Sequence, residues 1–215
     1  MPRRHAVTRQ VEHPTVVLGS TQRTEVVDAE RASDMGVAVV RRRGGGGAVL
    51  LRPGDHLWME AWIPRDDPLW DADVATAAAW VGAWWSNALG PQGAEDRVVH
   101  RGRAVPGDHG ALVCFSGRGP GELFLGGRKV MGISQWRSRE GALFHTCAYA
   151  RWEPGSLIEL LDVDEPTRAE LLADLPRSAI GVEDLAPATS SLTALGEVLL
   201  TSFPTWGKDL RPRQV

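Results

Sequence analysis

The sequence is poor in cysteine: its 215 residues include only Cys114 and Cys147, and no C-x-x-C motif. Two cysteines do not build a disulfide framework in a chain of this length, so we expect a reducing, cytoplasmic environment. The cysteine spacing of a zinc site is missing, and the six histidines contain no pair four residues apart. We therefore expect no metal site built from these residues.

Long apolar runs and an excess of positive charge are also missing. The longest apolar stretch, residues 74–85, is too short to span a bilayer. Residues 1–14 hold charges but no apolar segment typical of a signal peptide. The net charge of −3 and the pI near 6.1 argue against a general nucleic-acid-binding surface. We expect a protein that binds neither membranes nor nucleic acid.

What is present is ordinary globular composition with many tryptophans. Hydrophobic residues make up 43% of the chain, and neither a repeat nor a linker divides it, which predicts a single domain over residues 1–215. Nine tryptophans stand against one tyrosine, and six of the nine lie between Trp58 and Trp85. They indicate a bulky core or, alternatively, a slot for a lipid-like ligand that some of them line.

The hydrophobic pattern predicts strands first, then one long helix, then further strands and finally helices. We expect strands over residues 14–22, 36–43, 48–64 (two strands around a Pro-Gly turn), 97–102, 110–117, 121–136 and 141–152. We expect helices over residues 26–36, 67–90, 156–162, 167–175 and 190–203, with Pro166, Pro176 and Pro187 separating the last ones. This order lacks regular β-α alternation and indicates an α+β domain with a mostly antiparallel sheet.

Two loops place cations beside glycine-rich backbone next to a strand: RRRGGGGAV at residues 41–49 and GGRKVMGISQ at residues 126–135. Such backbone offers several N–H groups to one anion, and arginine and lysine add charge. Neither loop is a nucleotide-binding P-loop, because Val130 rather than Ser or Thr follows Lys129. Each loop alone is readily explained as a solvated basic turn, but together they predict a site for an acidic ligand.

The two loops resemble those of the lipoate–protein ligase, octanoyltransferase and biotin ligase superfamily, and most closely its lipoate–protein ligase A-like branch. Residues 41–49 resemble the family's Arg-Arg-x-Ser/Thr-Gly-Gly-Gly-Ala-Val loop, and residues 127–135 its Gly-Arg-Lys-Val-x-Gly-Ser-Ala-Gln segment. Residues 14–22 and 140–149 resemble its early strand and its histidine-bearing strand. The resemblance implies the biotin/lipoate protein ligase catalytic-domain fold, a mixed, mostly antiparallel β-sheet flanked by helices.

The resemblance also implies a reaction. A ligase of this family activates lipoate or octanoate with ATP and magnesium. It then transfers the acyl group to a lysine of a lipoyl carrier domain, as found in 2-oxoacid dehydrogenases and the glycine-cleavage H-type protein. Lys129 then corresponds to the active-site lysine that holds carbonyl and phosphate oxygens, and Arg42 faces the carboxylate or phosphate. The remaining implied site residues are Gly45, Gly46, Gly47 and Ala48 of the loop over the acyl group, and Gln135 and His145 of the acyl slot, with a structural role as the alternative for His145.

Two other readings stay open beside the ligase. Cys114 resembles the cysteine of octanoyltransferases that carry the acyl group as a thioester without ATP, although a buried cysteine between Val113 and Phe115 also suits a core. Gly44 stands where Ser or Thr is usual and Thr146 where glycine is usual, which keeps a non-catalytic acyl- or carrier-binding homologue in view. We expect no C-terminal accessory domain, which some ligases receive as a separate protein, and a truncated form of the family's N-terminal element.

Overall fold

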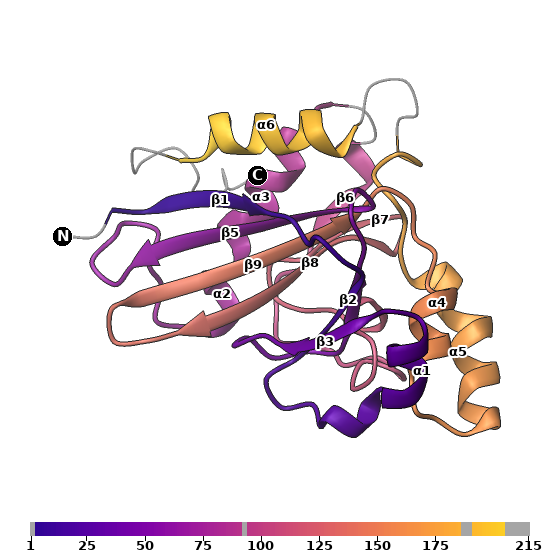
Figure 1. The fold of residues 1–215 in the computed structure, drawn as a ribbon. Coiled ribbons are helices and arrows are strands. Elements are labelled where there is room, and N and C mark those ends of the chain that lie inside the picture. Colours follow the sequence, from indigo (N-terminus) through magenta and orange to yellow (C-terminus); the bar gives the residue numbers. More distant parts are fainter. Residues whose placement is uncertain (1–2, 92–93, 186–190, 205–215) are drawn as a thin grey trace.

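The computed structural model describes residues 3–91, 94–185 and 191–204, which form two β-sheets and the helices that cover them (Figure 1). The larger sheet is entirely antiparallel, with strand order β1-β5-β9-β8-β7-β6. Its strands are β1 (His5–Arg9), β5 (His56–Pro64), β6 (Arg97–Val99), β7 (Leu123–Leu125), β8 (Arg128–Arg137) and β9 (Gly141–Tyr149).

The smaller sheet has the order β3-β2-β4. Its central strand β2 (Thr15–Leu18) runs parallel to β3 (Ala38–Arg41) and antiparallel to β4 (Val49–Leu51). One parallel pair among antiparallel ones makes the fold mixed and mostly antiparallel, so the fold class expected from the sequence is confirmed.

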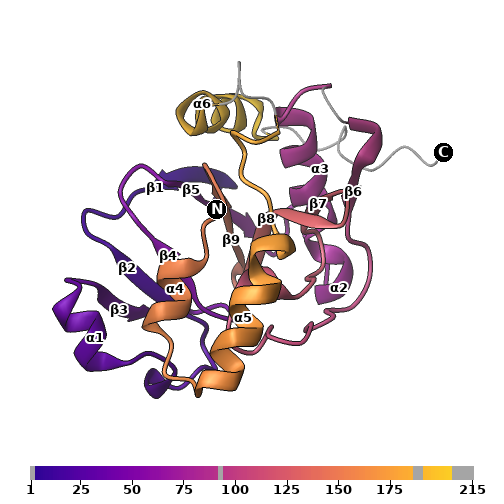
Figure 2. The same ribbon diagram turned by 90° about the vertical axis from the view of Figure 1, so that its right-hand side faces the viewer.

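Helices cover the two sheets separately (Figure 2). The larger sheet, called the long sheet below, is covered by α3 (Ala79–Ala88) and α6 (Leu192–Ser202). The single turn α2 (Val74–Ala77) comes just before α3 in the chain. Around the small sheet lie α1 (Ala29–Asp34), α4 (Gly155–Leu160) and α5 (Glu165–Ser178). Three short 3-10 turns complete the elements, η1 (Thr24–Val26), η2 (Ala94–Asp96) and η3 (Cys114–Ser116). None of the helices in the described ranges has the length and apolar character needed to cross a membrane.

Four of the tryptophans lie in two different places, three in the main core and one on the opposite face of the long sheet. Trp80, Trp84 and Trp85 are buried between α3, α6 and the long sheet, and the Trp84 indole N–H donates to the Leu199 carbonyl at 3.2 Å. Trp58 lies on the opposite face of β5 and packs against Cys147 and the small sheet. The bulky-core interpretation is confirmed for the helical tryptophans.

The helix predicted over residues 67–90 is wrong in its first third. Residues 67–73 form turns, in which the Asp67 carboxylate accepts from the Leu69 N–H and that of Asp73 accepts from the Ala75 N–H. Aspartate side chains that bind nearby backbone N–H groups favour turns and N-caps over helix interiors. The helical segment therefore begins after the cap residue Asp73 and ends before Gly90 as predicted, but it is divided at Ala78 into the two helices α2 and α3.

Other predicted elements also differ from the structure. Residues 110–117 are not a strand: Val113 makes one bridge to Ala48, and the chain then enters η3. Pro166 and Pro176 lie inside α5 rather than between helices; the missing N–H of Pro166 costs nothing in the first turn. Strand β1 was not predicted, because its five residues carry no buried side chain. Pro187 and Ser190 lie outside the described residues.

Candidate active site

The RRRGGGG loop is folded around the side chain of Arg42. Arg42 is 8% exposed, and its guanidinium donates to the carbonyls of Val17 at 3.1 Å, Gly45 at 2.7 Å and Gly47 at 2.9 Å. Its Nε has no acceptor within the part of the chain that the structure describes. In this structure Arg42 therefore shapes the loop from within, and the acid-facing role expected for it remains a prediction.

Two glycines of the loop cannot carry a side chain without strain. Gly46 has φ 97°, and a Cβ there would lie 3.0 Å from Arg42 Nη2 and 3.8 Å from the Cys114 sulfur. A Cβ on Gly47 would lie 2.5 Å from the Val113 carbonyl carbon. The loop backbone and the backbone before Cys114 are thus in direct contact, which only residues without Cβ allow.

Ala48 joins the two segments. Its N–H donates to the Leu112 carbonyl at 2.8 Å, and its carbonyl accepts from the Cys114 N–H at 3.0 Å. Ala48 is fully buried and absent from the lining of the cavity described below. The structure places it as the backbone link that fixes Cys114 against the glycine loop.

Lys129, the second residue of β8, lies next to a carboxylate that the sequence alone did not indicate. Its ammonium lies 2.8 Å from Glu122 Oε2 and 2.7 Å from the Cys114 carbonyl oxygen, and its side chain is 1% exposed. The Glu122 carboxylate, itself 3% exposed, also accepts from the N–H groups of Gly119 at 2.6 Å and Ile133 at 3.1 Å. The pair is neutral as a whole and fully hydrogen-bonded on the carboxylate side, which is what a buried ion pair requires.

The signal for Glu122 was present in the sequence. It is the only acidic residue between Asp108 and Glu140, and it stands just before an apolar strand that pairs with the lysine strand. A lone acid across a hairpin from a lysine predicts a pair when both are buried, but burial itself is a tertiary property.

A cavity of about 370 Å³ opens between the glycine loop, the η3 turn and β8. This volume lies in the range of small-molecule sites. The sequence-predicted residues on its lining are Gly45, Gly46, Gly47, Cys114, Lys129 and Gln135. Gln135 has its Nε2 buried without an acceptor among the described residues, so its amide has a donor to offer a ligand. Glu122 and Arg118 line the same cavity.

A much smaller slot of about 10 Å³ adjoins this cavity and shares Cys114, Ile133 and Ser134 with it. Trp58, Phe115 and Val49 make its walls mostly apolar. The slot has room for about one water molecule, so Cys114 stands at the junction of an open cavity and a nearly closed apolar pocket.

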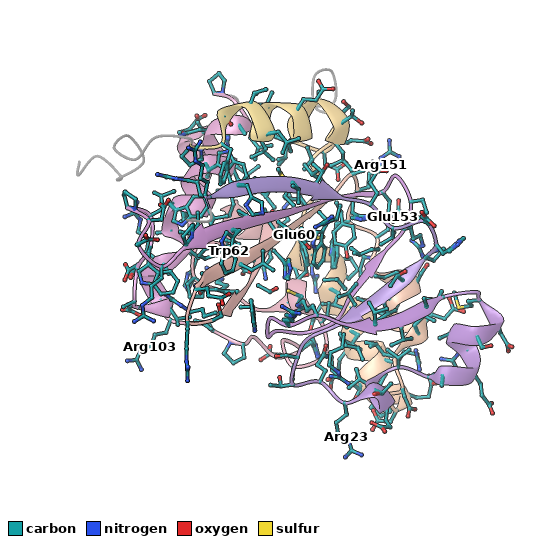
Figure 3. All side chains as sticks on the ribbon, turned by 60° about the vertical axis from the view of Figure 1, so that its left-hand side comes forward. Arg23, Glu60, Trp62, Arg103, Arg151 and Glu153 are labelled. Atoms are coloured by element: carbon teal, nitrogen blue, oxygen red, sulfur yellow. The ribbon has the colours of Figure 1, made fainter. Side chains whose placement is uncertain are left out.

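His145 lies on the small slot and not on the larger cavity. Its Nδ1 is 3.5 Å from the Ser134 hydroxyl and its Nε2 is 3.6 Å from Glu60 Oε1; Figure 3 shows Glu60 on the face of the long sheet. Burial lowers the pKa of His145, and the charges of Arg42 and Arg43 lower it further against the opposing effect of Glu60. The imidazole is therefore neutral at pH 7.

The site has the parts needed for acyl chemistry. The N–H groups of Gly45, Gly46 and Gly47 have no acceptor among the described residues, and three such groups beside a thiol suit a developing oxyanion. An ammonium has three N–H groups, and two of those on Lys129 are used by Glu122 and the Cys114 carbonyl. The third N–H of Lys129 has no oxygen acceptor among the described residues, and the ammonium nitrogen also lies 5.4 Å from the centroid of the Phe115 ring and 5.9 Å from that of Phe124.

Known proteins resemble this chain in sequence and in fold. Residues 5–204 match the family described as the lipoyl protein ligase A/B catalytic domain. Octanoyltransferase LipM of Moorella thermoacetica is 26% identical over 192 residues, covering 88% of this chain and 70% of that protein. Octanoyltransferase LipM of Clostridioides difficile is 24% identical over 159 residues, covering 74% of this chain and 58% of that protein.

Two solved structures share the fold. One is a bi-partite lipoate protein ligase from Thermoplasma acidophilum, studied with its E2 lipoyl domain; it has TM-score 0.69 and 21% identity, covering 94% of this chain and 71% of that one. The other is a lipoate-protein ligase A bound with ATP, with TM-score 0.67 and 20% identity, covering 94% and 72%. The resemblance that the two loops indicated is therefore confirmed.

Proposed function

Because the chain belongs to the family of lipoyl protein ligase A/B catalytic domains, we propose that it transfers an octanoyl or lipoyl group through Cys114 to a lipoyl carrier domain. The sequence alone favoured an ATP-dependent ligase over this cysteine-dependent transferase. The placement of Cys114 favours the cysteine-dependent transferase over the ligase. Its sulfur lies beside Gly46, and its carbonyl is held by Lys129, at the junction of the two pockets.

The first half-reaction moves the acyl group from a thioester donor to the enzyme. The Cys114 thiolate attacks the donor carbonyl carbon, and an S–C bond forms as the carbonyl oxygen becomes an oxyanion. The free N–H groups of the glycine loop and the third N–H of Lys129 stabilise that charge. The C–S bond to the donor then breaks, and the donor leaves as a thiol that carries the proton lost by Cys114.

The second half-reaction moves the acyl group to the carrier. The neutral ε-amine of the carrier lysine attacks the acyl-Cys114 carbonyl carbon, and a C–N bond forms through a second oxyanion. The C–S bond breaks, and the amine proton ends on the Cys114 sulfur. Both steps build negative charge at the same oxygen, so one set of donors serves both.

Cys147, on the wall of the same slot, is not expected to replace Cys114. Burial raises its pKa well above the ordinary value of a thiol. A thiol is a weak nucleophile compared with its thiolate, so Cys147 stays protonated at neutral pH. It provides a matched control for every experiment on Cys114.

An ATP-dependent lipoate ligase is the second candidate. It is favoured by the fold shared with a ligase bound with ATP and by the N–H-rich glycine loop beside a lysine. The Lys129–Glu122 pair weighs against it, because a triphosphate with magnesium needs surplus positive charge and Glu122 cancels that of Lys129. In this reading ATP would form an acyl-adenylate, with Lys129 and Gln135 at the acyl carbonyl.

The partners follow from the same chemistry. The acceptor is a lipoyl carrier domain of a 2-oxoacid dehydrogenase or of the glycine-cleavage H-type protein, and a separate accessory-domain protein is the further partner of the ligase reading. Residues 1–215 would act as one catalytic domain in this assembly. Two free thiols suit the reducing cytoplasm.

Intact mass spectrometry with a lipoyl carrier domain separates the two reactions. One tube holds octanoyl-loaded acyl carrier protein without ATP, and the other holds ATP, magnesium and lipoate. We expect carrier modification in the first tube, together with an acyl adduct on the protein itself. Cys114→Ser should remove the adduct and the transfer, whereas Cys147→Ser should keep both.

Modification only in the second tube, with no adduct on Cys114, would refute the transferase and support the ligase. Silence in both tubes, repeated with a candidate accessory protein, would leave a non-catalytic acyl- or carrier-binding homologue as the better description.

A further inference from the structure

Three polar side chains form a row across one face of the long sheet. His145 of β9 lies directly opposite Ser134 of β8 on one side and opposite Glu60 of β5 on the other. Side chains that face each other across neighbouring antiparallel strands have Cβ atoms about 4.5–5.5 Å apart. The pairing of the three strands therefore places a hydroxyl, an imidazole and a carboxylate next to one another.

The contacts between these groups have a definite direction. His145 Nδ1 lies 3.5 Å from Ser134 Oγ, and His145 Nε2 lies 3.6 Å from Glu60 Oε1. A carboxylate can only accept a hydrogen bond, so the imidazole proton belongs on Nε2, and Nδ1 accepts from the Ser134 hydroxyl. Hydroxyl, imidazole and carboxylate follow one another as in a Ser-His-Asp triad, and acid–base contacts of this length tighten when substrate binds.

Ser134 connects the row to the site of Cys114. Both residues line the 370 Å³ cavity and the adjoining slot, whereas His145 lines only the slot. The Ser134 hydroxyl has room there because residue 44 is glycine: a Cβ on Gly44 would lie 2.6 Å from Ser134 Oγ. The row thus begins beside the thiol and the glycine loop.

The other two members of the row can hold a proton for a short time. Glu60 (Figure 3) has a side chain 23% exposed, and its carboxylate accepts from Arg9 at 2.9 Å. Burial lowers the pKa of His145, and the charges of Arg42, Arg43 and Arg9 lower it further against the opposing effect of Glu60. The imidazole is therefore free to accept a proton at neutral pH, and the neighbouring carboxylate stabilises the imidazolium that forms.

The second half-reaction needs a group that accepts a proton and returns it. The amine nitrogen becomes positively charged as it bonds to the acyl-Cys114 carbonyl carbon, and it must lose a proton before the amide is complete. Lys129 cannot take this proton, because an ammonium paired with Glu122 has no lone pair. The base must therefore come from another part of the cavity lining.

We propose that the Ser134–His145–Glu60 row is the proton shuttle of the second half-reaction, an inference that rests on the transfer proposed above. As the C–N bond forms, the amine proton passes to Ser134 Oγ while the Ser134 hydroxyl proton passes to His145 Nδ1. As the C–S bond breaks, His145 Nδ1 returns its proton to Ser134 Oγ, and the Ser134 hydroxyl proton passes to the Cys114 sulfur. The amide and the free thiol form with no net change in the shuttle.

The shuttle makes the two half-reactions unequal. In the first, Cys114 attacks as a thiolate, and the departing donor sulfur needs no proton at the moment of cleavage, because thiols ionise near neutral pH. In the second, the attacking amine must lose a proton as it reacts. Loss of the shuttle should therefore slow deacylation of Cys114 and leave its acylation largely unchanged.

Quenched-flow intact mass spectrometry measures the two half-reactions separately. The enzyme is acylated with octanoyl-loaded acyl carrier protein, the acyl-enzyme is separated from this donor, and a lipoyl carrier domain is then added. Ser134→Ala and His145→Gln should each slow deacylation about a hundredfold, within the range of general acid–base catalysis. Acylation should stay within about threefold of the wild type, which shows at the same time that each variant is folded.

Two comparisons separate a shuttle from a general loss of packing. The double variant Ser134→Ala, His145→Gln should be no slower than either single variant, because the effects of residues that act as one unit do not add. Ser138→Ala and His5→Gln are the matched controls, since Ser138 lies between β8 and β9 and His5 is exposed on β1. Both controls should deacylate at the wild-type rate.

The pH dependence of deacylation identifies His145 as the base. The ratio of the wild-type rate to the His145→Gln rate removes the titration of the carrier lysine, which both reactions share. This ratio should fall as pH drops through the folded pKa of His145, because the imidazolium cannot accept a proton. Glu60 raises that pKa, so in a Glu60→Gln background the fall should move to lower pH, a shift that a purely structural role of Glu60 would not produce.

The outcomes distinguish the shuttle from the transfer on which it rests. If the donor leaves no acyl group on wild-type Cys114, the proposed transfer and the shuttle both fail. If the acyl-enzyme forms and Ser134→Ala passes its acyl group on at the wild-type rate, the transfer stands and the shuttle is overturned. Multiplied losses in the double variant, or a rate ratio that does not change with pH, would also overturn the shuttle.

Discussion

Arg42 and Lys129 are both buried cations beside Cys114, but the protein compensates them differently. Arg42 donates to three backbone carbonyls and meets no carboxylate among the described residues. Lys129 meets a buried carboxylate and one carbonyl. The arginine keeps its net charge and organises backbone, whereas the lysine loses its net charge to Glu122 and presents a directed N–H.

Arg42 and Lys129 stand in similar basic, glycine-rich loops of the sequence, but the fold gives them different tasks. A guanidinium has five N–H donors in a rigid plane and can hold a loop together. An ammonium is a compact donor that a partner can aim. Variants that change one of these cations, or the groups around it, and leave the other in place test whether the two tasks are separate.

The largest effect is expected for Lys129→Ala. The substitution leaves the Glu122 carboxylate buried without its cation, and an uncompensated buried charge costs about 3–5 kcal/mol. The free energy of unfolding, measured with urea, should fall by that amount, and acyl transfer should be lost.

The control for this variant is the double substitution Lys129→Met with Glu122→Leu. Replacing a buried pair with apolar residues of similar size is often neutral for stability. The double variant should regain most of the stability and none of the transfer. Recovery of both would show that the ammonium has no part in the reaction.

Arg42→Lys is expected to cost less, about 2 kcal/mol of unfolding free energy. The charge is kept, but one ammonium cannot reach the carbonyls of Val17, Gly45 and Gly47 in the geometry of the fork. Acylation of Cys114 should slow about tenfold as the loop loses its shape. Arg43→Lys, an exposed neighbour whose guanidinium lies over the Trp136 ring, should stay within about 0.5 kcal/mol. Equal losses in the two variants would show that the loop does not depend on Arg42.

Gly46→Ala should cost about 1–2 kcal/mol, because φ 97° is strained for any residue with Cβ. The added methyl would also lie beside Arg42 and the Cys114 sulfur, so acylation should slow as well. Gly45→Ala is the control, since a Cβ there meets nothing within 4 Å and its φ is not positive. Urea unfolding of the pair should differ by at least about 1 kcal/mol, and identical curves would contradict the loop geometry.

The sequence was sufficient for the parts of this site that are local. The glycines beside arginines, the lysine next to glycine-rich backbone at Lys129 and the cysteine between Val113 and Phe115 could all be recognised in the sequence. It was insufficient for Glu122, whose role exists only because β7 and β8 pair and bury it. It was also insufficient for the contacts of Arg42, because the motif carries the charge but does not specify that the guanidinium donates to the carbonyls of Val17, Gly45 and Gly47.

The same limit explains the fold. Strands with buried, β-branched residues and the helix ends at glycine were predictable from pattern. The edge strand β1 was not, because its side chains stay partly exposed and its position depends on pairing with β5 more than fifty residues away. The turn at Cys114 replaced an expected strand, since the contact of Gly47 with Val113 leaves no room for continued pairing.

The smallest effect concerns His145, which reports the charge of Arg42 and not that of Lys129. Burial is the main cause of its lowered pKa, and Arg42 contributes. Because the folded pKa lies below the unfolded value of 6.5, the unfolded chain binds the proton first as pH falls. The free energy of unfolding should therefore decrease as pH drops through 6.5 and level off below the folded pKa, by about 1.4 kcal/mol for each unit of lowering. His145→Gln should remove this part of the pH dependence.

Measured by NMR titration, the pKa of His145 should rise in Arg42→Gln and stay unchanged in the Lys129→Met, Glu122→Leu double variant. A shift in the double variant as large as in Arg42→Gln would mean that the two cations act on the slot alike, and the contrast between them would fail.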